Sequence, residues 1–145
     1  MSSKLIAIDL DGTTLNDESL LSTRTIRTLR TLQNAGHHVV IATGRPYRIS
    51  KDIYEEIGLH SPMINFNGAL CHVPNNKNWK KFFHKTLDAD LAMDIFRKKD
   101  LFEVSSVIIE GKEEIYSSIE QVPENVFFPA NTRSTFINGE SSFKE

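Results

Sequence analysis

The chain has 145 residues, which is the length of a typical single domain. Apolar residues make up 39% and charged residues 25%, and 17 basic against 19 acidic residues give a net charge of −2. This balance supports a packed core under a polar surface, and it excludes a strongly basic nucleic-acid-binding protein and an acidic disordered tail.

The first half of the chain alternates buried-type strands with amphipathic helices. Residues 5–8 are wholly apolar, as in a strand that is buried on both faces of a parallel sheet. Ser22 is a candidate N-cap, and the apolar residues that follow at three-residue steps predict a helix that ends at Gly36. Residues 38–42, which are apolar after His38, predict a second strand of the buried type.

A second helix and a third strand follow. Pro46 suits the first turn of a helix, and isoleucines at four-residue spacing continue it until Gly58. Residues 62–66 predict a third strand, and Asn67-Gly68 predicts a tight turn. Right-handed crossovers between these elements predict an α/β fold, a Rossmann-like parallel sheet with helices on both faces.

The pattern changes after about residue 70. Residues 79–86 resemble a strand, and Asp88 is a candidate cap for a further helix. Residues 104–118 predict a hairpin around a central glycine, and no clear period follows from residue 121 onward. The predicted division of the chain is an α/β region at 1–72 and an α+β region at 73–145.

The single cysteine and the short apolar start narrow the class of protein further. Cys71 stands alone, so an intramolecular disulfide and a cysteine-rich metal framework are excluded and a reducing compartment is favoured. The apolar run at residues 5–8 is too short for a signal peptide or a membrane span. We therefore expect a soluble cytoplasmic protein that binds neither nucleic acid nor membranes.

The strongest chemical signal directly follows the first predicted strand. Asp9 and Asp11 lie two residues apart at its carboxyl end, the end where open α/β sheets bind ligands. Two carboxylates there can ligate a hard cation such as Mg²⁺, and one can act as a nucleophile while the other transfers a proton. Gly12 would let backbone N–H groups approach an anion, although the same residues also form plain turns.

Three motifs at strand ends carry a resemblance to a known family. The first motif of the haloacid dehalogenase superfamily of phosphohydrolases resembles Asp9-Leu10-Asp11-Gly12-Thr13-Thr14-Leu15, and the second resembles Ala42-Thr43-Gly44-Arg45. Asn67-Gly68-Ala69, after the third predicted strand, resembles the motif that is typical of the Cof-type branch of that superfamily. This branch inserts a cap after its third strand. The resemblance implies that residues 1–72 are the N-terminal part of the family's core and that 73–145 are part of its cap.

The resemblance also implies roles for the matching residues. Asp9 would attack a phosphate monoester of a small metabolite to form a phosphoaspartate, and Asp11 would protonate the leaving alcohol and then activate water. The Asp9 side chain and the Asp11 backbone carbonyl would bind Mg²⁺ as the cofactor. Substrate phosphate would be bound by backbone or side-chain groups of Leu10, Gly12, Thr43, Gly44 and Arg45.

Two of the motif residues have a second interpretation. Arg45 can bind phosphate through its planar guanidinium, or it can form a salt bridge or a contact at the start of the helix. Asn67 can line the site, or it can simply set the turn.

The same family pattern calls for groups that this sequence does not show. A phosphate-binding lysine and a Gly-Asp-x-x-Asn-Asp motif that completes the Mg²⁺ site are implied, and the sequence has no Gly-Asp dipeptide. We therefore expect a truncated form that is weakly active or inactive by itself. Without further strands, residues 5–8 would form an apolar sheet edge through which the chain self-associates.

Three functions remain as hypotheses. The first is a Mg²⁺-dependent phosphatase that acts on small phosphorylated metabolites. The second is a non-catalytic α/β binding or assembly module derived from that family. The third is a phosphoacceptor domain in which a phosphorylated aspartate serves as a signal, and the motifs at Thr43 and Asn67 favour the first over this one.

Overall fold

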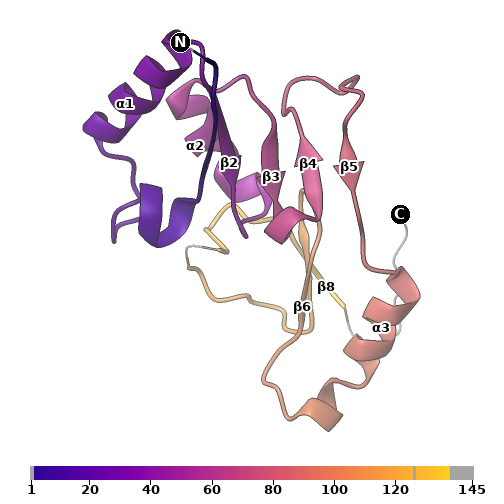
Figure 1. The fold of residues 1–145 in the computed structure, drawn as a ribbon. Helices are drawn as coiled ribbons and strands as arrows, with labels where there is room; N and C mark the ends of the chain where they lie inside the picture. The colour runs from indigo at the N-terminus through magenta and orange to yellow at the C-terminus, as the bar shows by residue number, and fades with distance from the viewer. Residues whose placement is uncertain (1, 126, 138–145) are drawn as a thin grey trace. The chain divides into compact units, whose positions relative to one another are not determined.

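The computed structural model describes residues 2–125 and 127–137 (Figure 1). Contacts divide the chain into two compact units, Met1–Lys85 and Thr86–Glu145. The helices and strands of the first unit are β1 (Leu5–Ile8), α1 (Thr23–Asn34), β2 (His38–Ala42), α2 (Tyr47–Ile57), β3 (Met63–Asn65), β4 (Leu70–His72) and β5 (Phe83–His84). Those of the second unit are α3 (Ala89–Arg97), β6 (Ile108–Glu110), β7 (Ile115–Ser117) and β8 (Ser134–Phe136).

The first unit contains a five-stranded sheet in the order β1-β2-β3-β4-β5, with β2 to β5 side by side in Figure 1. Strands β1, β2 and β3 are parallel, with Ile6 opposite Val39 and Ile41 opposite Met63. Strands β4 and β5 add to the sheet in antiparallel fashion. The predicted parallel pairing is therefore confirmed for the first three strands. The structural division lies after β5 rather than at residue 72, because β4 and β5 pair with the first sheet.

Both helices of the first unit pack on the same face of its sheet. Leu29 of α1 and Ile57 of α2 share one apolar cluster with Val39, Ile41 and Met63 of the sheet. The predicted fold class, a sheet covered by helices, is confirmed, whereas helices on both faces of the sheet are not seen in the described part of the chain. The physical reason is the strand order, since two right-handed crossovers that step in the same direction place their helices on the same side.

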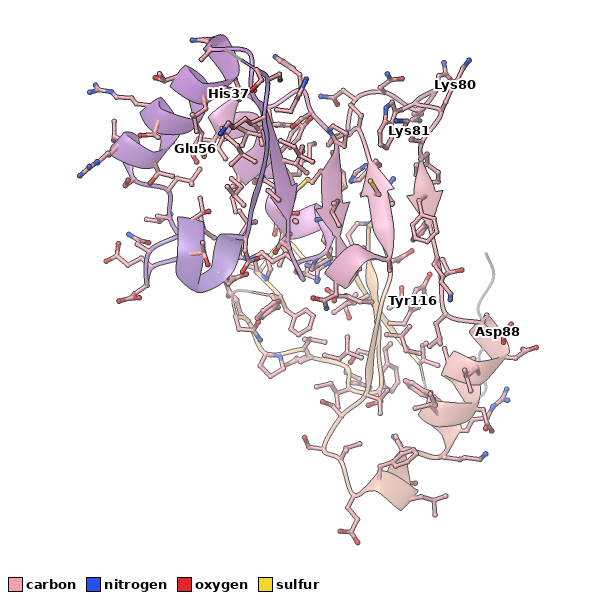
Figure 2. The ribbon with its side chains drawn as sticks, in the orientation of Figure 1. His37, Glu56, Lys80, Lys81, Asp88 and Tyr116 are labelled. Atoms are coloured by element: carbon pink, nitrogen blue, oxygen red, sulfur yellow. The ribbon has the colours of Figure 1, made fainter. Side chains whose placement is uncertain are left out.

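Capping residues set the helix boundaries, as the sequence predicts. The backbone N–H of Thr25 donates to the Ser22 side chain at 3.0 Å at the start of α1. Gly58, with φ of 78°, ends α2 in the left-handed conformation that favours glycine. Asp88 caps α3, where its side chain accepts from the Leu91 N–H at 3.1 Å (Figure 2). None of the helices in the described residues has the length and hydropathy needed to cross a bilayer.

The outer edge of β1 is open in the described residues. Strand β1 is the first in the sheet order and pairs only with β2. Leu5 is 72% exposed, an unusual environment for a large apolar residue in a strand. An open apolar edge invites pairing with another strand.

The second unit has a small sheet of its own. Strands β6 and β7 form the predicted hairpin, which the Gly111 N–H closes by donating to the Glu114 carbonyl at 2.8 Å. Strand β8 adds to β7 in parallel and comes from the region where the sequence shows no period. The strand predicted at 79–86 is only Phe83–His84. Residues 126 and 138–145 of the unpatterned region lie outside the described residues.

Alkaline pH is expected to destabilise the first unit through Tyr54. Its hydroxyl donates to the Ser61 carbonyl at 2.7 Å, and burial raises its pKa from 10.0 to about 12. Above pH 10 the unfolded chain releases a proton that the folded chain retains, so stability should fall as the pH rises from 10 to about 12. Urea denaturation at several pH values measures this loss. Tyr54→Phe should flatten the decline, and an unchanged slope would contradict the role of Tyr54.

Candidate active site

A cavity of about 440 Å³ lies where β2 and β3 end, and its lining combines several predicted residues. Polar groups from two motifs and the turn after β3 meet there, as expected at the carboxyl ends of parallel strands. The cavity is lined by Asp9, Ala42, Thr43, Gly44, Ile64, Asn67 and Gly68.

Asp9 directly follows β1 and precedes a wide, irregular turn that spans Leu10–Thr14, in which Asp11 has an extended backbone. The Leu15 N–H donates to the Leu10 carbonyl at 2.9 Å, and the Thr14 hydroxyl donates to the Asp9 carbonyl. Leu10 is fully buried in the core, so only its backbone can reach a ligand. Gly12 has φ of 66°, a value that other residues rarely adopt. This turn leaves the Asp9 side chain exposed beside the cavity.

The loop after β2 is fixed against the turn after β3. The Thr43 N–H donates to the Ile64 carbonyl at 3.0 Å, and the Asn67 N–H donates to the Thr43 carbonyl at 3.3 Å. Gly44 lies so close to Asn67 that a Cβ atom there would be 2.9 Å from the Asn67 Oδ1. Asn67 therefore both shapes the turn, with φ of 53°, and lines the cavity, so the two interpretations of this residue apply together.

Asp11 and Arg45 form a bidentate ion pair. The Arg45 Nη2 is 2.6 Å from the Asp11 Oδ1, and the Arg45 Nε donates to the Asp11 Oδ2 at 2.9 Å. The side chain of Arg45 is 5% exposed and that of Asp11 is 50% exposed. Neither residue lines the cavity. Arg45 therefore forms the salt bridge that was one of its two predicted interactions, and its partner is the predicted proton-transfer residue.

This pair sets the protonation state of Asp11. The hydrogen bonds from Arg45, followed by the attraction of its positive charge, hold the pKa of the Asp11 carboxyl below its ordinary value. The Asp11 side chain is therefore ionised at neutral pH in this arrangement. An ionised carboxylate can accept a proton from water, whereas it has no proton to give to a leaving alcohol.

A larger cavity of about 670 Å³ lies at the opposite, amino-terminal end of β2. Its lining includes Arg30, His37, His38 and His60, and Figure 2 labels His37 there. Arg30 is engaged with the end of α2, where its Nη2 donates to the Glu56 carbonyl at 2.7 Å. None of the residues predicted for catalysis or phosphate binding lines this cavity.

Polar residues that the motifs do not include lie buried behind the Thr43–Arg45 loop. Ser50, Asn65 and His72 are connected by hydrogen bonds and have little exposed surface. The sequence offers one signal for them, because an asparagine within the apolar run at 62–66 needs partners if it is buried.

Comparisons with known proteins identify the family. A sequence model of the haloacid dehalogenase-like hydrolases matches residues 6–145. The chain belongs to this family. Its fold agrees with that of a haloacid dehalogenase-like hydrolase from Bacteroides thetaiotaomicron, which superposes with a TM-score of 0.77 at 22% identity. The superposition covers 94% of this chain and 52% of that protein.

Relatives with higher sequence identity are phosphatases or putative phosphatases. A 5-amino-6-(5-phospho-D-ribitylamino)uracil phosphatase of Bacillus subtilis is 38% identical over 77% of this chain. A haloacid dehalogenase-like hydrolase structure from B. subtilis is 33% identical and superposes with a TM-score of 0.65 over 81% of this chain and 40% of its own. The chain spans 41% of the length of the uracil-derivative phosphatase.

The donor set suits Mg²⁺ in kind, because the Asp9 carboxylate and the backbone carbonyl of Asp11 are both hard oxygen donors. Within residues 2–125 and 127–137, this site included, no three His, Cys, Asp or Glu side chains gather as metal ligands. The Asp11 carboxylate is paired with Arg45, so Asp9, which lines the cavity, is the side chain that would contribute a ligand.

Proposed function

We propose that the protein to which this chain belongs is a Mg²⁺-dependent phosphatase that hydrolyses phosphate monoesters of small metabolites through a phosphoaspartate on Asp9. The observation that carries the proposal is the single cavity lined by Asp9, Thr43 and Asn67. Membership of a family of hydrolases, with a named phosphatase at 38% identity, supports the same chemistry.

In the proposed reaction, one Asp9 carboxylate oxygen forms a bond to phosphorus while the bond from phosphorus to the ester oxygen breaks. The leaving alkoxide takes a proton from Asp11. Water then attacks the phosphoaspartate, Asp11 accepts a proton from that water, and inorganic phosphate leaves with Asp9 regenerated as a carboxylate. Two displacements of this kind divide one difficult step into two easier ones.

The residues around the cavity suit the charge that moves in these steps. The Thr43 Oγ1 accepts from the Arg45 N–H at 3.1 Å, which leaves the Thr43 hydroxyl proton to donate to a phosphoryl oxygen. Backbone N–H groups of Leu10 to Gly12 and of Gly44 would add donors. When bound at Asp9 and the Asp11 carbonyl, Mg²⁺ would neutralise charge on the phosphoryl group.

Asp11 can act as the acid only after its bond to Arg45 is loosened. We infer that the phosphate of the substrate competes with the Asp11 carboxylate for the Arg45 guanidinium, which suits either anion in bidentate geometry. Both interpretations of Arg45 then describe successive states of one residue.

We further propose that the 145-residue chain is part of a longer protein and acts in the cytoplasm. The limited share of the relatives that it spans supports the first inference. The alternative is a non-catalytic α/β binding or assembly module derived from the same family.

Thr43→Ala in the whole protein is expected to lower kcat/KM for p-nitrophenyl phosphate on the order of tenfold to a hundredfold. Thr43 supplies one of several donors to the phosphoryl group, so the loss should be smaller than for a lone donor. Phosphate release with and without Mg²⁺ measures it. Thr31→Ala, on the exposed surface of α1, is the matched control. Equal rates for both variants would contradict the role of Thr43, and Mg²⁺-independent turnover would contradict the cofactor.

A further inference from the structure

Three polar side chains from different elements form a buried cluster in the first unit. Ser50 comes from α2, Asn65 from the end of β3 and His72 from the end of β4. Ser50 and Asn65 have no exposed surface and His72 is 5% exposed. Buried polar groups are costly unless they are paired, so this cluster has to be explained by what it holds in place.

Asn65 is the centre of the cluster. Its Nδ2 donates to the Arg45 carbonyl at 3.0 Å and to the Ser50 Oγ at 2.9 Å. Both amide hydrogens are used by these bonds, so the Oδ1 is the atom that faces His72. The His72 Nε2 lies 3.2 Å from that Oδ1 and must therefore carry a proton and donate it.

The atoms that the cluster binds belong to the loop that follows β2. The Arg45 carbonyl also accepts from the Phe66 N–H at 3.3 Å. The Ser50 hydroxyl donates to the Pro46 carbonyl at 2.9 Å. The Tyr47 and His72 rings pack nearly perpendicular to each other, with a centroid distance of 4.8 Å.

The direction of the Arg45 side chain follows from these hydrogen bonds to the loop, which we call the clamp. Its backbone N–H is bound by the Thr43 Oγ1 and its carbonyl by Asn65 and Phe66. With both backbone groups of the residue fixed, the guanidinium is directed to Asp11, and the Thr43 Oγ1 is held at the Arg45 N–H as its acceptor. Small displacements of such groups are costly in phosphoryl transfer, where positioning supplies much of the rate.

We propose that Asn65 and His72 are positioning residues, which hold the Thr43–Arg45 loop in the geometry that phosphoryl binding requires. Neither residue lines the 440 Å³ cavity, so they act through Arg45 and Thr43 rather than on the substrate. The expected effect on catalysis rests on the proposed function, whereas the hydrogen bonds of the clamp belong to the fold itself.

The clamp is tested on the 145-residue chain by nuclear magnetic resonance of the Arg45 Nε–H. His72→Phe removes the donor and leaves the Asn65 Oδ1 unpaired, so Asn65 should release the Arg45 carbonyl. Hydrogen exchange of the Arg45 Nε–H should then quicken about fivefold, the factor that corresponds to one neutral hydrogen bond. His72→Gln keeps an N–H donor close to the position of the Nε2 and should restore slow exchange. Circular dichroism confirms that each variant is folded.

Ser50→Ala provides a milder variant if His72→Phe does not fold. It removes one of the two acceptors of the Asn65 amide and should change the exchange rate in the same direction by less. Wild-type exchange in His72→Phe, or in Ser50→Ala where the first variant is unfolded, would overturn the clamp, as would failure of His72→Gln to restore it.

A second arm separates the clamp from the proposed function. In the whole protein, His72→Phe should lower kcat for p-nitrophenyl phosphate about tenfold with little change in KM, and His72→Gln should recover most of it. An exchange effect in a protein with no phosphatase activity would contradict the proposed function alone. Normal kcat together with fast exchange would contradict the positioning role.

Discussion

Asp9→Asn in the whole protein is expected to lower phosphate release by about 10⁴-fold or more, since an amide cannot act as the nucleophile in covalent catalysis. The side chain of Asp9 is exposed and lines the cavity. The substitution removes a charge without a change of size and buries nothing, so the fold should be retained. Steady-state release of inorganic phosphate measures the effect.

A matched control for this variant lies on the same segment. Asp17 is exposed in the loop before α1, and Asp17→Asn removes the same charge outside the cavity. It should leave kcat within about twofold of the wild type, as is usual for surface substitutions away from a site. Turnover by Asp9→Asn comparable to that of Asp17→Asn would contradict the assignment of the nucleophile.

The 145-residue chain alone is expected to hydrolyse phosphate esters much more slowly than an ordinary enzyme, whose rate is about one per second. The expected reduction is at least on the order of a hundredfold to a thousandfold, which is the effect of losing one transition-state donor. Asp9 and the Asp11 carbonyl supply only part of a Mg²⁺ shell, and Mg²⁺ dehydrates reluctantly where protein ligands are few. The family pattern also calls for a lysine that has no counterpart assigned here.

The open edge of β1 adds a second expectation for this chain. With Leu5 72% exposed, the apolar edge should drive self-association. Phosphate release and light scattering on the same purified sample check both points. A monomer that turns over at about one per second would contradict them, and would show that residues 71–145 supply the missing groups.

The sequence predicts the first sheet well because its signals are local. The apolar runs at 5–8 and 39–42 fall within β1 and β2, since strands of parallel sheets read as nearly continuous apolar runs. The capping roles of Ser22 and Asp88 depend only on the residues of one helical turn, and both are present in the structure. The grouping of Asp9 with Thr43 follows from parallel strands that end at the same edge of a sheet.

Features that depend on distant partners are not visible in the sequence. Strand β8 pairs with β7 without any local period, because its place is set by the strand it joins. The Arg45–Asp11 pair joins residues 34 positions apart, and only the structure shows that Arg45 holds the carboxylate of the predicted acid. The contacts of Asn65 with Arg45, Ser50 and His72 likewise exist only after the strands are paired.

The choice of helix face has a similar origin. The prediction of helices on both faces took the usual outcome for a Rossmann-like sheet. Here the strand order β1-β2-β3 runs in one direction, so the two crossovers that carry α1 and α2 fall on the same side.

The most direct test of the account is the chemical identity of the phosphorylated residue. The whole protein, mixed with a rapidly hydrolysed phosphate ester and Mg²⁺ and then quenched in acid, should yield by peptide mass spectrometry one phosphoryl group on Asp9. Asp9→Asn treated in the same way should yield none. Two results would contradict the central claim that Asp9 is the nucleophile. One is phosphate turnover with the phosphoryl group on another residue, and the other is turnover with no phosphorylated residue in any quenched sample.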